Sequence, residues 1–366
     1  MVRILVNNGY RVSVCCYYEY DPRIVDEFQS TGAVVELLHL TRSAGQSTLG
    51  EISTLFRALV AEFHSHRDSI VHVQYVAPGL VPIVAAKFSG IRTIFATIHY
   101  PRHALGIMEL LFVRLAARVS TLFICNSTAT EDSWFGASKL FDTSLKLSAH
   151  HCTIYNAVDE KKISLLSSSV DGNAKRRELG IGREKIICVV GRLRSEKGHE
   201  FLFRAMVQVL QFFTSVRLLL VGEGPDKARL QALAVELGIE KNIVWAGAKS
   251  QDETFSLYGI ADVVVVPSQF EGFGLTAAEA MAAGIPVVGT DVGGLRDVVD
   301  DQSTGFLVPY NDSQRLSEAI LRLLRDEALS KKMGMAGREK VRRQFSLPQY
   351  ESSLIAVYSR YLHNAQ

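Results

Sequence analysis

The chain has 366 residues, enough for two domains of ordinary size, each with its own core. Its 40 Lys and Arg residues nearly balance its 38 Asp and Glu residues, which argues against a general nucleic-acid binder, a class with a marked basic excess. Hydrophobic residues make up 48% and charged residues 21%, a composition that excludes a disordered chain.

The sequence carries no pattern typical of secretion or membrane insertion. Its five cysteines form no CxxC pair, and we interpret them as reduced thiols of a reducing compartment. The most apolar stretch, residues 104–125, is interrupted by three charged residues, so we expect buried core there instead of a membrane span. Polar Asn7 and Asn8 follow only a few apolar residues, unlike a secretory signal. We expect a cytoplasmic protein, at most peripheral at the cytoplasmic face of the membrane.

Short β-branched runs alternate with helical stretches along the whole chain. Strands are predicted at residues 10–18, 33–40, 69–75, 92–99, 121–127, 151–158, 185–193, 216–222, 242–247, 262–268, 285–290 and 305–309. Continuous apolar runs such as the four valines at 263–266 are typical of strands buried on both faces, hence of parallel sheets covered by helices. The predicted fold class is α/β, with two doubly wound Rossmann-like domains facing a cleft.

The alternation relaxes into a polar stretch near the middle of the chain. We predict an N-terminal domain at 1–160, a linker at 161–183 and a C-terminal domain at 184–345. A final helix at 346–366 is amphipathic and is expected to pack back on the N-terminal domain. Ligands of open α/β sheets bind at the carboxyl ends of strands, so the candidate site lies between the two domains.

A basic loop follows the first strand of the second half. That strand ends at Gly191, Arg192 and Lys197 bracket the loop, and a helix begins near Gly198. A helix start offers free N–H groups, while Arg and Lys add positive charge, so the loop is a candidate phosphate site. The alternative is a solvated basic loop in which Glu196 pairs with its neighbours.

A second glycine-rich loop follows the all-valine strand. Residues 269–286 contain two glycines, then a helix that ends at Gly284. The amides of Gly274, Leu275 and Thr276 are expected to face an anion at the sheet edge. Glu271 in the loop and Glu279 in the helix suit hydroxyl groups better than phosphates. The alternatives are a solvated carboxylate for the first and a capping box with the threonine for the second.

A third loop, Val221–Pro225, leads from a strand through two glycines toward a helix. By itself it is an ordinary βα turn. It gains interest because it is expected at the same sheet edge as the other two loops.

Together these segments resemble glycosyltransferase family 4. The motifs are Gly191-Arg192 with Lys197-Gly198, Val221-Gly-Glu-Gly-Pro225, Glu271-Gly-Phe-Gly, Glu279-Ala, Gly284-Ile-Pro-Val and Gly293-Gly-Leu with Gly305. First-half segments, 70–74, 97–99, 125–127 and 154–159, resemble the family as well. The resemblance implies a GT-B fold and a retaining, nucleotide-sugar-dependent enzyme. The two glutamates, with seven residues between them and both flanking signatures, carry it.

The resemblance also implies residue roles. Arg192 and Lys197 would bind the donor diphosphate, Glu271 would meet hydroxyls of the transferred sugar, and Glu279 would hold the nucleotide ribose. His99, at the end of a first-half strand, would face the reacting sugar, although a satisfied strand-end histidine is the alternative. The remaining implied donor-binding positions are Gly191, Glu223, Phe273, Gly274, Leu275 and Thr276.

One departure from the family concerns the first residues. Met1–Asn8 is expected to be the end of the first helix, and 8–14 the start of the second strand, so the first strand and its Gly-rich loop are expected to be missing. That expectation keeps open a second function, a catalytically impaired GT-B-fold subunit that binds a nucleotide or a partner. A dinucleotide-dependent oxidoreductase is disfavoured because no GxGxxG follows a strand with an acidic residue about 20 positions on.

The predicted function is transfer of a hexose-type sugar from a nucleotide diphosphate sugar to a hydroxyl acceptor in glycan, glycolipid or polysaccharide synthesis. No Asp-x-Asp metal motif occurs, so we predict metal-independent catalysis without a cofactor, with fixed cations at the leaving diphosphate. UDP, GDP and ADP donors are not distinguished. Expected partners are the donor and a sugar or lipid-linked acceptor, without nucleic acid. The basic cluster 338–343 suggests weak membrane-surface contact, although a solvated helix face is its usual meaning.

Overall fold

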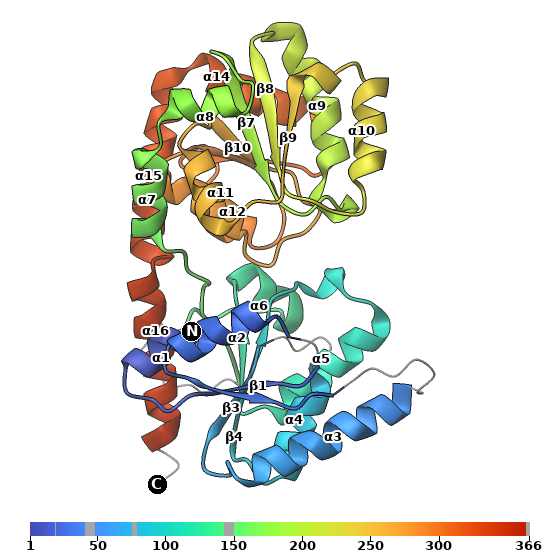
Figure 1. Cartoon of the computed structure of the whole chain (residues 1–366), viewed down its shortest axis with the longest axis vertical. Coiled ribbons are helices and arrows are strands. Elements are labelled where there is room, and N and C mark those ends of the chain that lie inside the picture. Colours follow the sequence, from blue (N-terminus) through green and yellow to red (C-terminus); the bar gives the residue numbers. More distant parts are fainter. Residues whose placement is uncertain (19, 41–47, 75–78, 143–149, 364–366) are drawn as a thin grey trace. The chain divides into compact units, whose positions relative to one another are not determined.

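A computed structural model describes residues 1–18, 20–40, 48–74, 79–142 and 150–363. Contacts along the chain divide it into two compact units, each containing parallel strands and helices (Figure 1). The first unit comprises Met1–Asn126, Phe135–Ile154 and Tyr350–Gln366, and the second comprises Ser127–Trp134 and Tyr155–Gln349.

The described strands of the first unit form two parallel sheets. One pairs β1 (Ser13–Cys16) with β2 (Val34–Leu37). The other has the order β3-β4-β5-β6, and its bounds are Ile70–Val73, Thr93–Ile98, Leu122–Cys125 and His151–Thr153. All six residues of β4 are buried, as a central strand covered on both faces requires.

Helices cover these sheets and connect their strands. The helix expected at the start of the chain is present as α1 (Val2–Asn7). The helices that follow in chain order are α2 (Pro22–Ser30), α3 (Thr48–His64), α4 (Leu80–Phe88), η1 (Arg102–Ala104), α5 (Ile107–Val119) and α6 (Thr128–Phe135). The final helix α16 (Leu347–His363) contributes Leu354 and Val357 to the same core cluster as Phe95.

The second unit contains one six-stranded parallel sheet in the order β12-β11-β10-β7-β8-β9. Its strands are β7 (Lys185–Val190), β8 (Val216–Val221), β9 (Ile243–Gly247), β10 (Val263–Val266), β11 (Val287–Thr290) and β12 (Gly305–Val308). The four valines of β10 are all buried, which confirms that their continuous apolar run indicated a doubly covered strand.

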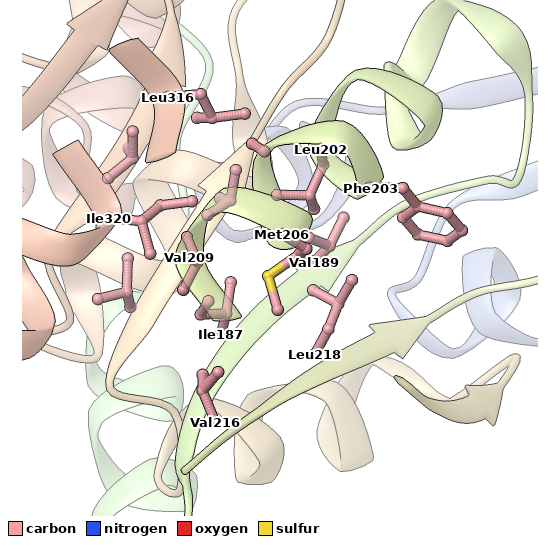
Figure 2. Packing of buried hydrophobic residues seen from close by; sticks show 14 of the residues in the cluster. Ile187, Val189, Leu202, Phe203, Met206, Val209, Val216, Leu218, Leu316 and Ile320 are labelled. Atoms are coloured by element: carbon pink, nitrogen blue, oxygen red, sulfur yellow. The ribbon is translucent and has the colours of Figure 1, made fainter. Parts of the chain in front are cut away.

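Helices lie on both faces of this sheet (Figure 1). They are α9 (His199–Phe212), α10 (Lys227–Glu236), α11 (Gln251–Tyr258), α12 (Leu275–Ala282), α13 (Leu295–Val298), α14 (Ser313–Arg325) and α15 (Glu327–Gln344), with short turns η2 (Ser195–Lys197) and η3 (Glu240–Asn242). Figure 2 shows how one face is filled: Met206 and Val209 of α9 lie over Ile187 of β7, and Ile320 of α14 lies beside Val209.

The polar stretch that we expected to link the domains is helical. It forms α7 (Glu160–Ser169) and α8 (Gly172–Glu178), and both belong to the second unit. Asp159 caps α7 by accepting a hydrogen bond from the Lys162 amide, and Ile163 is fully buried. None of the described helices is both long and apolar enough to cross a bilayer.

Candidate functional site

The strand order of the second unit reverses between β7 and β10. From β7 the chain builds outward through β8 and β9, then returns to the other side of β7 for β10, β11 and β12. The carboxyl ends of strands at such a reversal are where open α/β sheets bind ligands. The predicted loops of the second half leave the sheet at this edge.

The loop after β7 is fixed by its neighbours on both sides. The Gly191 amide donates to the carbonyl of Val221 at 3.0 Å, which ties this loop to the end of β8. Gly198 has a φ of +69°, and a Cβ there would lie 1.9 Å from the carbonyl oxygen of Pro267, so the backbones approach too closely for any side chain. Arg192 is exposed at this edge.

Lys197 and Glu271 form an ion pair between two loops. Lys197 Nζ lies 2.5 Å from Glu271 Oε1, and the hydroxyl of Ser268 donates to the same oxygen at 2.8 Å. The Glu271 side chain is only 17% exposed, so it is not the freely solvated loop carboxylate of the alternative interpretation. Sequence reasoning did not single out Ser268, which directly follows the buried strand and Pro267.

The backbone beside Glu271 is clamped by residues from two other segments. The amide of Gly294 donates to the carbonyl of Glu271 at 2.9 Å, and a Cβ at Gly293 would lie 2.1 Å from that oxygen. The buried hydroxyls of Ser127 and Thr130 donate to the carbonyl of Gly272. These bonds preorganise the loop, because few of its backbone groups are free to move.

The helix after this loop presents its first turn to the edge. Gly274 occupies the N-cap position of α12 with a φ of +100°, and no side chain caps the helix. In any helix the first amides lack partners within the helix, so those of Leu275 and Thr276 are available to an anion. Phe273 is buried and packs edge-on against Phe345, which leaves only its backbone for a ligand.

Glu279 is held by a hydrogen bond from a neighbouring helix of the second unit. It lies partly buried inside α12, and its Oε2 accepts a 3.0 Å hydrogen bond from the Tyr258 hydroxyl. Burial raises the pKa of Glu279 to about 7, and the bond from Tyr258 acts in the opposite direction. The capping-box alternative is wrong, because Gly274 is the N-cap and the hydroxyl of Thr276 faces the carbonyl of Val190 at 3.4 Å.

Glu223 lies in the third loop and is more exposed than the other two glutamates. Its carboxylate accepts a 2.8 Å hydrogen bond from Nζ of Lys227, the first residue of α10. Gly222 beside it is required by packing, because a Cβ there would lie 1.9 Å from the carbonyl oxygen of Gly191. The loop thus supports the loop after β7.

His99 belongs to the first unit, where it directly follows β4. It is half-buried, and burial lowers its pKa, which favours the neutral ring at pH 7. Its neighbour His72 hydrogen-bonds Thr97 at 2.7 Å and Tyr358 at 2.8 Å, and burial lowers the pKa of His72 to about 3. Two neutral histidines therefore lie at the edge of this sheet.

A cavity of about 260 Å³ opens beside the loop after β7. His199, which lines it, is 2% exposed, and its Nδ1 has no hydrogen-bond partner among the described residues. Burial lowers the pKa of this ring to about 4, so it is neutral at pH 7 and offers a lone pair. Sequence reasoning missed it because a histidine that begins a helix has no distinctive signal.

The loops of the second unit thus carry cations, the free amides of a helix start and two carboxylates. Such an arrangement suits a ligand with a phosphate at one end and hydroxyl groups beside it. In the part of the chain that the structure describes, no three His, Cys, Asp or Glu side chains are grouped as metal ligands.

Comparison with known proteins agrees with this chemistry. Residues 171–340 match the family described as "Glycosyl transferases group 1", so the resemblance to glycosyltransferase family 4 is confirmed. N-acetyl-alpha-D-glucosaminyl L-malate synthase of Bacillus anthracis is 32% identical over 207 residues, covering 56% of this chain and 52% of that protein. D-inositol 3-phosphate glycosyltransferase of Segniliparus rotundus is 37% identical over 226 residues, covering 58% and 50%. The chain spans about half the length of these curated relatives.

Solved structures share the fold. HepE of Anabaena, crystallised with UDP and glucose, has a TM-score of 0.82 and 22% identity, covering 98% of this chain and 94% of that one. Sucrose-phosphate synthase of Thermosynechococcus elongatus has a TM-score of 0.76 and 23% identity, covering 100% and 92%. The predicted GT-B fold class, with two doubly wound units, is confirmed.

Proposed function

We propose that this chain, whose residues 171–340 belong to the group 1 glycosyltransferases, moves a hexose-type sugar from a nucleotide diphosphate sugar to a hydroxyl acceptor with retention of configuration. One observation carries the proposal: the ion pair of Lys197 and Glu271 joins the loops after β7 and β10, the two strands at which the order of one parallel sheet reverses. Relatives named as glycosyltransferases, and a structural neighbour that holds UDP and glucose, support it.

The proposed chemistry needs positive charge at the leaving diphosphate. Arg192, Lys197 and the first amides of α12 supply that charge without a metal ion. One unit charge about 4 Å away contributes roughly 4 kcal/mol at an effective dielectric constant near 20. Glu271 then accepts hydrogen bonds from the transferred sugar and Glu279 from the ribose. For His99 of the first unit we propose a role in the reaction as a neutral ring that binds a hydroxyl.

We propose that neither glutamate attacks the sugar. Attack of the acceptor on the same face as the departing phosphate, with that phosphate taking the acceptor proton, retains configuration without a covalent enzyme adduct. The acceptor is a hydroxyl of a glycan, a polysaccharide or a lipid-linked sugar, used at the cytoplasmic face of a membrane. Trapping a glycosyl adduct on Glu271 would contradict this mechanism.

The test is a thermal-shift screen of UDP-, GDP- and ADP-sugars, followed by hydrolysis and transfer assays with each stabilising donor. A saturating ligand at 100 times its Kd adds about 2.7 kcal/mol to folded-state stability, so binding is readily seen. We expect one donor class to stabilise the chain and to be turned over. Stabilisation without hydrolysis or transfer would favour the nucleotide-binding subunit, and no stabilisation by any donor would refute the proposal.

A further inference from the structure

Helix α5 of the first unit is apolar on both of its faces. Val113 and Ala116 are buried in the unit, as expected of a surface helix. The opposite face carries five large apolar side chains that are 41–79% exposed, namely Ile107, Met108, Leu111, Phe112 and Leu115. At about 100° per residue these five fall within a stripe of roughly 140°. A helix face in water is normally polar, so this stripe indicates a partner.

Exposed apolar side chains are also present on the helices next to α5. Helix α4 packs between α3 and α5, and on its exposed positions it carries Val84 and Phe88, the latter 72% exposed. The ring of Phe88 contacts Phe56 of α3 at 5.6 Å between centroids. The two α-helices that precede α5 in the chain therefore carry exposed apolar side chains as well.

The same part of the chain is strongly basic. Residues 80–119 contain five Lys and Arg residues but only one acidic residue, Glu109, in a chain whose overall charge is +2. The Glu109 carboxylate accepts a 2.8 Å hydrogen bond from the Gly106 amide and so caps the start of α5. Arg114 and Arg118 are exposed on α5 itself.

We propose that the outer face of α5 docks on the surface of a bilayer that contains anionic lipids. An amphipathic helix of this kind lies in the interface, with its apolar stripe buried roughly 5–10 Å among headgroups and acyl chains. Arg114 at the border of the stripe and Arg118 in the last turn of α5 reach the phosphate layer, where long basic side chains keep their charge in water.

A second copy of the chain fits this surface less well. A symmetric dimer pairs the same patch on both subunits, so it would bring together two surfaces that both carry a net positive charge. A bilayer with anionic lipids supplies both the apolar layer and the opposite charge.

Docking through α5 would bring the membrane surface close to His99, a residue of the proposed function. Helix α5 begins eight residues after His99, at the carboxyl end of β4. Docking would hold a lipid-linked acceptor near that edge. The basic cluster first considered for membrane contact is less suited, because Arg342 and Arg343 both pair with Glu339. The docking itself does not depend on glycosyl transfer.

The experiment is sedimentation of the full chain with vesicles of phosphatidylcholine alone or mixed with phosphatidylglycerol. We expect binding to the anionic vesicles only, weakened at about 0.5 M salt. Leu111→Gln/Phe112→Gln should lower the partition coefficient at least about tenfold, because two apolar side chains no longer enter the bilayer. Arg114→Gln/Arg118→Gln should lower it about tenfold, since each charge near the surface contributes to binding.

The matched control is Val235→Gln/Met335→Gln, which removes two side chains of the second unit that are 65% and 66% exposed. It should bind vesicles as the original chain does. The docking proposal is overturned if the original chain stays in solution with both vesicles, or if the control loses as much binding as the α5 variants. A lipid-independent dimer that Leu111→Gln/Phe112→Gln dissociates would instead assign this face to self-association. Stabilisation by a nucleotide sugar should persist in every variant, which separates this test from that of the proposed function.

Discussion

Lys197 Nζ lies 2.5 Å from Glu271 Oε1, and this ion pair joins the loop after β7 to the loop after β10. The ammonium group is therefore held by an internal carboxylate before a ligand arrives. In the proposed reaction the diphosphate competes for Lys197, and Glu271 becomes free to accept hydrogen bonds from sugar hydroxyls. The pair would then couple binding of the phosphate to recognition of the sugar.

Replacing Lys197 by methionine tests this arrangement. Lys197→Met keeps most of the side-chain volume but removes a positive charge from the leaving group, so we expect turnover to fall about a hundredfold or more. The measurement is kcat with the donor found in the thermal-shift screen. Lys332→Met, on the exposed surface of α15, is the matched control and should leave kcat unchanged.

A double-mutant cycle that combines Lys197→Met with Glu271→Gln tests whether the two side chains act together. Residues in direct contact are energetically coupled, so the double variant should lose less activity than the product of the two single losses. Fully multiplicative losses would show that the two side chains act independently, contrary to the ion pair.

Glu279 predicts how stability depends on pH. Its pKa in the folded chain is about 7, above the usual 4.5, so the folded state binds more protons than the unfolded state between these values. The contribution of Glu279 to the free energy of unfolding is therefore fully present below about pH 4.5. It is lost as the pH rises through 7, and the loss amounts to at most roughly 3 kcal/mol. Glu279→Gln removes this loss. Melting temperatures of both proteins from pH 5 to 8 should diverge, with the variant favoured at high pH, and parallel curves would contradict the prediction.

The sequence predicted the site loops better than the contacts within them. A βα loop at the end of a buried strand must lie at the carboxyl edge of the sheet, so Arg192 and Glu271 were placed from pattern alone. The sequence did not reveal the partner of Glu279, because Tyr258 is 21 residues away and looks like any other core residue. Such pairing depends on how α11 and α12 pack, which no local signal encodes.

A comparison of Gly198 with Gly180 distinguishes the cost of a steric clash from the cost of a left-handed backbone conformation. Gly198 and Gly180 have φ values of +69° and +66°, but a Cβ meets Pro267 only at Gly198 and has open space at Gly180. Gly180→Ala should cost roughly 1 kcal/mol, the strain of a left-handed residue. Gly198→Ala must in addition displace a backbone carbonyl, so we expect a much larger fall in melting temperature and loss of donor binding. Equal effects of the two substitutions would show that the loop after β7 shifts freely.

The misassigned linker shows where composition misleads. The serines of α7 suggested a solvated connection, yet Ile163, Leu166 and Ser167 share one side of a helix that packs on α11. A short amphipathic helix with a serine-rich outer face resembles a loop when only its polarity is counted.

Ile163→Ala measures whether α7 is part of the second unit's core. The side chain is fully buried, so its truncation leaves a cavity and should cost about 2–5 kcal/mol. Leu165→Ala, on the same helix at 65% exposure, is the matched control and should change stability by less than about 0.5 kcal/mol. The comparison is made by thermal unfolding with and without a bound nucleotide sugar, because the ligand stabilises the unit that binds it. If α7 were only a flexible linker, the two variants would have the same melting temperature. Packing of α7 on α11 instead requires that Ile163→Ala lower the melting temperature of the ligand-bound unit.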